Sequence, residues 1–196
     1  NINSIAIVGG IVRDLITKSI HKDYDINFND LDLIIEGDTT IYIQELQNIL
    51  GPDQVKIIRN NTAYKTSEII INGIKVDIAS AREEKYPIPG ENPIVELSTI
   101  KNDLIRRDFN INAMAIELKE NKLIDLFSGS EAISNMRIDF LHDLSVLEDP
   151  TRIIRASRYS AKLGFNISNK ALKQIQNTIT LWPWNWHISD QPDLAP

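Results

Sequence analysis

The sequence contains no cysteine, no long hydrophobic run and no excess of positive charge. The lack of cysteine excludes disulfides and thiolate metal sites, and it fits a reducing cytoplasm. No apolar run approaches the roughly 20 residues that a membrane-spanning helix requires, so we expect no membrane segment. A net charge of −6 argues against a protein that binds nucleic acid with its whole surface. Residues 148–173 depart from this trend, because they hold six lysines and arginines but two acids.

The remaining composition, 42% hydrophobic and 24% charged, is ordinary for a globular protein. The 196 residues can form one domain and part of a second. The chain does not begin with methionine, which is typical of a piece of a longer protein.

Strand patterns come first along the chain and helix patterns last, which predicts an α+β fold followed by a helical region. The predicted strands are residues 4–9, 31–36, 55–58, 64–71, 74–79, 111–118 and 122–126. The predicted helices are residues 11–18, 39–50, 98–106, 148–163 and 169–179. Asn72-Gly73 predicts a hairpin turn, and three prolines with a glycine predict a loop over residues 83–93.

Two acids, Asp30 and Asp32, stand two residues apart in an otherwise apolar strand. Side chains two apart on a strand share a face, and paired carboxylates there are costly to desolvate unless a cation neutralises them. The alternative is a pair on a solvated strand with no ligand, and Asp23-Tyr24-Asp25 shows how common the pattern is. The apolar surroundings of Asp30 and Asp32 favour a metal.

A third acid, Asp77, lies between Val76 and Ile78 on another predicted strand. Three such carboxylates could hold two Mg²⁺ ions and stabilise an in-line attack on phosphorus.

Gly9-Gly10 follows the first predicted strand and precedes a helix. Glycine turns of this kind hold phosphates on backbone N–H groups, although tight turns before helices are common. Arg13 would oppose the helix dipole unless an anion lies close, which favours a phosphate ligand over a solvated arginine.

Further arginines stand in two later segments, Arg106-Arg107-Asp108 and the series Asp149, Arg152, Arg155 and Arg158. The first could simply stabilise a helix C-terminus, and the second could be a solvated helix face. The order of an acid followed by arginines also suits a nucleotide lying along the helix. A carboxylate accepts from an exocyclic amine and a guanidinium donates to a ring acceptor, so Asp149 with Arg152 would admit cytosine and adenine. Arg155 and Arg158 would then be free for phosphates.

These motifs together resemble the class II tRNA nucleotidyltransferases, which include CCA-adding enzymes and bacterial poly(A) polymerases. The similar segments, in chain order, are residues 8–14, 30–38, 106–115 and 148–159. The resemblance implies a polymerase-beta-like nucleotidyltransferase head with a mixed sheet, over residues 1–141. It implies an incomplete helical neck that recognises the base at 142–180, and an unstructured or truncated tail at 181–196. The stretch between Arg13 and Asp30 is longer than is usual in the family.

The resemblance also implies roles and partners. Asp30 and Asp32 would bind the catalytic Mg²⁺, while Gly10, Arg13 and Arg107 would contact the nucleotide. Asp149 and Arg152 would read the base, with Arg155 and Arg158 completing the pocket. The expected reaction adds C, A or both to the 3′ end of tRNA from CTP or ATP, releasing pyrophosphate. The alternatives are a poly(A) polymerase on other RNA and a catalytically idle nucleotide-binding module. RNA-binding body and tail domains are expected to be missing from this chain or supplied in trans.

Overall fold

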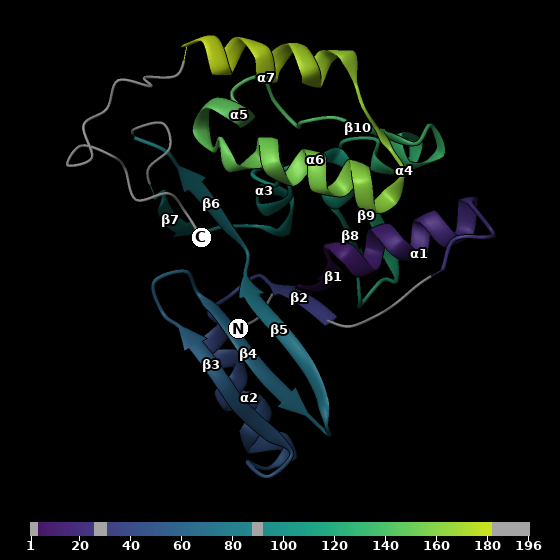
Figure 1. The fold of residues 1–196 in the computed structure, drawn as a ribbon. Helices are drawn as coiled ribbons and strands as arrows, with labels where there is room; N and C mark the ends of the chain where they lie inside the picture. Colours follow the sequence, from purple (N-terminus) through teal and green to yellow (C-terminus); the bar gives the residue numbers. More distant parts are fainter. Residues whose placement is uncertain (1–3, 26–30, 88–91, 182–196) are drawn as a thin grey trace.

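A computed structural model describes residues 4–25, 31–87 and 92–181, and its centre is a seven-stranded mixed sheet (Figure 1). The strand order is β3-β4-β5-β2-β1-β8-β9. The strands of this sheet are β1 (Ile5–Val8), β2 (Leu31–Ile35), β3 (Val55–Asn61), β4 (Thr66–Ile71), β5 (Ile74–Ser80), β8 (Met114–Glu117) and β9 (Lys122–Asp125). The β2–β5 pair is parallel and the other neighbouring pairs are antiparallel.

Helices surround the sheet, and two small two-stranded sheets stand apart from it. The helices are α1 (Gly10–Ile20), α2 (Thr39–Leu50), α3 (Ile100–Ile105), the 3-10 turn η1 (Asn110–Asn112), α4 (Gly129–Ser134), α5 (Ser145–Glu148), α6 (Thr151–Leu163) and α7 (Asn169–Leu181). The small sheets are β6 (Arg82–Lys85) with β7 (Ile94–Leu97), and β10 (Arg137–Ile138) with β11 (Asn166–Ile167). No helix in the described ranges is long and apolar enough to cross a membrane.

The two faces of the central sheet are covered to different extents. On one face, isoleucines and valines of β2 to β5 pack with Ile43 of α2. On the other face, Ile34 of β2 packs with Ile100 and Leu104 of α3. Because side chains alternate along a strand, Asp32 shares this second face with Ile34. A cavity opens on this face over β4 and β5, and its lining includes Asp77 of β5 and the neighbouring Asp32 of β2.

A separate apolar cluster joins the sheet to the C-terminal helices. Phe109, Ile133, Ala156 and Phe165 are buried in it, and the Phe109 and Phe140 rings lie 5.4 Å apart. Figure 1 shows α6 and α7 at the opposite end of the molecule from the β3–β4 hairpin. This cluster therefore fixes α6 against the head of the molecule.

Most predicted elements are confirmed, including the helix at residues 39–50 and the α+β class. The Asn72-Gly73 turn is confirmed, with positive φ at both residues. The loop prediction for residues 83–93 is wrong at its start, because β6 pairs with β7. The predicted strand at 111–118 begins as the 3-10 turn η1. The predicted tail residues 182–196 and Asp30 lie outside the described residues.

The helix predicted over residues 148–163 is interrupted, which changes the position of Asp149. Asp149 has extended backbone between α5 and α6, and α6 begins at Thr151 after Pro150. The pyrrolidine ring of Pro150 disfavours helical backbone in the preceding residue, so the chain bends there. Asp149 and the three arginines therefore do not form one continuous helical stripe.

Candidate active site

A cavity of about 550 Å³ opens between the central sheet, the β6 strand and the start of α6. Its lining brings together five arginines and four acids from distant parts of the sequence. The arginines are Arg82, Arg106, Arg107, Arg152 and Arg155, and the acids are Asp32, Glu84, Asp108 and Asp149. A larger cavity of about 780 Å³ lies near β10, β11 and the start of α7. The lining of that larger cavity contains none of the candidate residues from the sequence.

The Gly9-Gly10 turn forms one wall of the 550 Å³ cavity. Gly9 has φ +75°, and a Cβ built there would lie 2.8 Å from Oδ2 of Asp32. Only glycine combines this backbone conformation with so close an approach. The turn leads into α1, whose first N–H groups have no partner within the helix. The wall thus offers backbone donors beside a carboxylate.

Asp32 and Asp77 are paired in register on the parallel strands β2 and β5. Neighbouring strands lie about 4.8 Å apart, so the two carboxylates stand side by side on the open face. Asp32 lines the cavity. Within the described ranges no group of three or more His, Cys, Asp or Glu residues is arranged to hold a metal. The two adjacent carboxylates are nevertheless hard oxygen donors of the kind that Mg²⁺ prefers.

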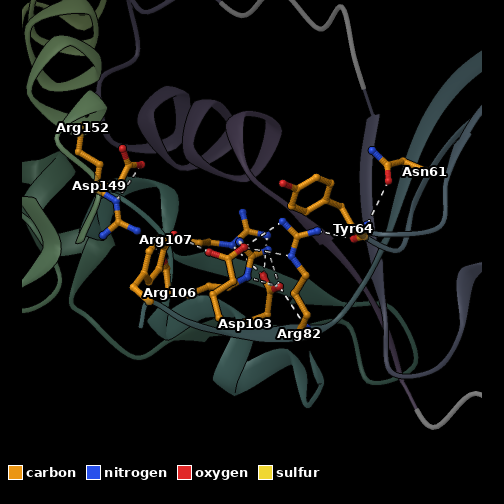
Figure 2. Close-up of polar contacts among 10 residues, drawn as sticks. Asn61, Tyr64, Arg82, Asp103, Arg106, Arg107, Asp149 and Arg152 are labelled. Atoms are coloured by element: carbon orange, nitrogen blue, oxygen red, sulfur yellow. Dashed lines mark hydrogen bonds and ion pairs between the residues drawn. The ribbon is translucent and has the colours of Figure 1, made fainter. Parts of the chain in front are cut away.

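An arginine network lies beside the sheet, and Figure 2 shows Arg106 and Arg107 converging on Asp103 of α3. Asp103 is fully buried and lies 2.7 Å from Arg106 and 3.1 Å from Arg107. Burial alone would lower the pKa of Arg106, but the carboxylates of Asp103 and Glu84 overcome this effect and raise it. Arg106 is therefore held as a cation, and the ion pairs with Asp103 fix the positions of both arginines.

The β6 strand adds a second carboxylate to this network. Glu84 binds both Arg82 and Arg106, at 2.9 Å and 2.8 Å. It also accepts a hydrogen bond from the Tyr86 hydroxyl at 2.9 Å. Burial, together with the charge of Glu84, raises the pKa of the Tyr86 phenol. Tyr86 thus remains a neutral hydroxyl in the cavity wall at physiological pH.

The α6 side of the cavity presents arginines that already have protein partners. Arg152 is 4% exposed and donates to the backbone oxygen of Arg106 at 2.9 Å. Its Nε lies 3.6 Å from Oδ2 of Asp149, whose Oδ1 accepts from the Thr151 N–H at 2.9 Å. Arg155 binds Asp108 at 2.6 Å. Each group has a defined orientation before any ligand binds.

Three predicted residues in the described ranges lie outside this cavity lining: Asp77, which stands beside Asp32 on β5, Arg13 and Arg158. Arg13 is 3% exposed, and it donates to Asn112 at 2.8 Å and to Asp14 at 2.8 Å. Asn112 in turn binds Asp108, so Arg13 lies behind the cavity wall rather than on it. Arg158 is exposed and does not line the cavity, whereas Tyr159 does. The structure brings together Gly10, Asp32, Arg107, Asp149, Arg152 and Arg155.

Several cavity residues were not predicted from the sequence. They are Asn61, Tyr64, Thr66, Arg82, Glu84, Tyr86, Pro93, Arg106, Asp108, Asn112, Thr151 and Tyr159. Arg82, Glu84 and Tyr86 come from β6 and its end, but the residues between them, Glu83 and Lys85, are also charged, so no apolar/polar alternation marked this strand in the sequence. Tyr64 comes from the β3–β4 turn, and Figure 2 shows it next to Arg82.

Comparisons with known proteins give consistent results. The model of the family described as the poly A polymerase head domain matches residues 5–139. The chain is 37% identical over 178 residues to an A-adding tRNA nucleotidyltransferase of Geobacter sulfurreducens, covering 89% of this chain and 19% of that protein. It resembles an apo CCA-adding enzyme structure with a TM-score of 0.80 and 33% identity, covering 91% of this chain and 40% of that one.

A further similar structure is a tRNA nucleotidyltransferase complexed with a primer tRNA and an incoming ATP analog. The TM-score is 0.71 and the identity 32%, covering 91% of this chain and 47% of that one. The chain thus spans less than half the length of each of these three proteins.

Proposed function

The chain belongs to the family of the poly A polymerase head domain, and on this basis we propose that it is the catalytic part of an RNA nucleotidyltransferase. The proposed reaction adds A, C or both to the 3′ end of tRNA from ATP or CTP and releases pyrophosphate. The name of the A-adding relative supports ATP as the first nucleotide to test. A poly(A) polymerase acting on other RNA is the alternative within the same chemistry.

One observation carries this proposal: a single cavity contains the Gly9-Gly10 turn, the Asp32 carboxylate and five arginines. A nucleoside triphosphate needs donors for its phosphates and polar groups for its base. The turn at the start of α1 and Arg107 supply donors next to Asp32. Asp149 and Arg152 supply the paired acceptor and donor at the α6 side. A nucleotide bound across the cavity would meet both sets.

The residues present fit a divalent cation, which we propose to be Mg²⁺. Nucleotidyltransferases of this family are generally dependent on a divalent metal. Asp32 would hold the cation together with Asp30 and with substrate phosphates, and Asp77 is the adjacent carboxylate. A cation bound there supplies charge stabilisation at the triphosphate and lowers the pKa of the attacking 3′-hydroxyl.

The residues of the chain orient the nucleotide around that centre. The N–H groups of the Gly9-Gly10 turn and the Arg107 guanidinium would hold the phosphates. Oδ1 of Asp149 is engaged by Thr151, which leaves the Oδ2 edge beside Arg152 to accept from an exocyclic amine. Adenine and cytosine both present an amine beside a ring acceptor, whereas guanine and uracil present the reverse polarity. Arg155 and Tyr159 would complete the wall.

We further propose that the head extends to residue 141 and that residues 142–180 form the base-recognising neck. The match of the head-domain model to residues 5–139 supports this boundary. We expect the protein to act in the cytoplasm and to need RNA-binding domains beyond the described residues for tight tRNA binding.

The test is incubation of the chain with Mg²⁺, radiolabelled ATP or CTP, and tRNA whose 3′ end has been shortened. We expect labelled tRNA extended by one to three nucleotides, together with pyrophosphate. Extension of unrelated RNA by long runs of A would favour the poly(A) alternative. Nucleotide binding without any extension would favour the catalytically idle module.

A further inference from the structure

A second cavity, of about 370 Å³, lies on the open face of the sheet next to the proposed nucleotide site. Its lining includes Asp77, Glu68 and Arg59. The two cavities share Asp32 and Arg107 in their linings. Asp32 therefore stands at the junction of two separate spaces.

The polar lining of this second cavity is a row that crosses four neighbouring strands. Asp32 is in register with Asp77, Asp77 with Glu68, and Glu68 with Arg59. The row therefore runs from β2 through β5 and β4 to β3 on one face. It begins at Asp32, in the proposed metal site, and ends at the guanidinium group of Arg59.

Arg59 differs from the arginines of the nucleotide cavity, because its side chain has no hydrogen-bond or ion-pair partner among the described residues, although its backbone pairs with β4. Glu68 lies opposite Arg59, but its carboxylate binds Lys75 at 3.2 Å. In contrast, Arg82, Arg106, Arg107, Arg152 and Arg155 are all paired with protein groups. Arg59 is exposed and can take an external anion.

The chemistry of the proposed reaction requires two spaces on either side of one carboxylate. In phosphoryl transfer the attacking and leaving oxygens lie roughly in line across the phosphorus. The acceptor hydroxyl and the pyrophosphate must therefore come from opposite sides. The cavity with five arginines suits the triphosphate. The other cavity, with carboxylates near Asp32 and one arginine at its far end, suits a ribose hydroxyl followed by a single phosphate.

We propose that the second cavity holds the 3′-terminal nucleotide of the RNA acceptor and that Arg59 binds its phosphate. This inference rests on the proposed function. Arg59 is then a positioning residue for the RNA acceptor, and it does not take part in binding the nucleotide. The other charged groups along its path, Lys75 and Glu68, are paired with each other.

The test compares Arg59→Ala with Lys56→Ala in the full chain, using a short single-stranded RNA that ends in CC as acceptor. Lys56 lies on the same strand as Arg59 but does not line the cavity, and its substitution by alanine removes the same single positive charge. Loss of one phosphate contact should raise the KM for RNA about fourfold at 0.15 M salt. It should also reduce the slope of log KM against log salt by about 0.7. The KM for ATP should not change, and Arg59→Lys should recover part of the loss.

The outcomes separate this inference from the proposed function. If wild-type chain extends the RNA and Arg59→Ala has an unchanged KM for RNA, the acceptor site is wrong while the proposed function stands. Equal losses in Arg59→Ala and Lys56→Ala would also overturn the inference, because they would reflect general charge alone. A wild-type chain that transfers no nucleotide under any condition overturns the proposed function and with it the premise of this site.

Discussion

The open face of the sheet and the start of α6 line the same cavity, but their charged side chains differ: those on the sheet are like charges placed side by side, and those on α6 are already paired with protein groups. On the sheet, strand register places Asp32 beside Asp77, so like charges are brought together. On α6, Arg152 and Arg155 are already bound by a backbone oxygen and by Asp108. Adjacent carboxylates gain from a bound cation, whereas paired arginines gain little new energy from a ligand. We therefore expect the sheet to bind the metal and support nucleotide transfer, and the start of α6 to select the base.

The largest expected effect is on the sheet side. We expect Asp32→Asn to abolish nucleotide transfer, because the amide cannot replace a carboxylate that neutralises a cation. The melting temperature without Mg²⁺ should hold or rise, since one of two adjacent charges is removed. Transfer assays and thermal melts check both points, with the exposed Asp53→Asn as control. If Asp32→Asn transfers nucleotide at the wild-type rate, Asp32 has no role in the reaction.

The next effect concerns the wall between turn and sheet. Gly9→Ala should slow transfer about 100-fold, because a methyl group would displace Oδ2 of Asp32 from its position 2.8 Å away. Gly164→Ala is the matched control, with φ +70° and no atom within 4 Å of its Cβ. Both variants place alanine at positive φ, which costs roughly 1–3 kcal/mol, and the cost is higher at Gly9, because its ψ of −141° lies outside the left-handed helical region that Gly164 occupies. Equal loss of transfer in the two variants would show that strain alone, and not the position of Asp32, is responsible.

On the α6 side we expect selectivity to change more than rate. Asp149→Ala should reduce discrimination against GTP and UTP about ten- to a hundredfold, the value of one lost bidentate base contact. Thr151→Val, which loses the hydroxyl bonded to Asp149, controls for a disturbed start of α6. Arg158→Ala should leave the affinities for all four nucleotides unchanged, because Arg158 lies outside the cavity lining. A uniform loss of affinity in Asp149→Ala would contradict base reading by this residue.

The smallest expected effect is on the pH dependence of folding stability, and it comes from His142 next to α5. Burial, together with the charge of Arg152, lowers the pKa of His142, and Glu148 at 3.4 Å opposes this only in part. A proton therefore binds the unfolded chain more tightly than the folded one, so stability is present above about pH 6.5 and is lost as the pH falls below it. Thermal melts between pH 5 and 8 should show less of this dependence in His142→Gln than in wild type. An unchanged pH profile in the variant would exclude His142 as the source.

Local sequence patterns were sufficient for the elements that position Asp32. The apolar run in residues 31–36, the glycines at 9 and 10, and the Asn72-Gly73 turn are all local signals, and the structure has the corresponding strand, turn and hairpin. The pairing of Asp32 with Asp77 was not readable, because register between distant strands depends on the whole sheet.

The parts that sequence could not give depend on long-range pairing. The four residues of β6 are polar and its partner β7 follows a proline-rich stretch, so neither has a strong local signal. Their position is fixed instead by ion pairs such as Glu84 with Arg106, which are 22 positions apart. Regular spacing also made Arg158 look equivalent to Arg155, although the structure orients only Arg155 toward Asp108.

The central claim is that one nucleotide spans from the sheet to α6, and an NMR titration of isotopically labelled chain with ATP and Mg²⁺ tests it most directly. The signals to follow are the Gly10 amide and the Arg152 Nε–H, which come from opposite walls of the cavity. We predict that both signals shift along one binding curve with the same Kd, and that CTP behaves in the same way. Shifts confined to one wall, or two curves with different Kd values, would contradict a single nucleotide site that joins the two regions.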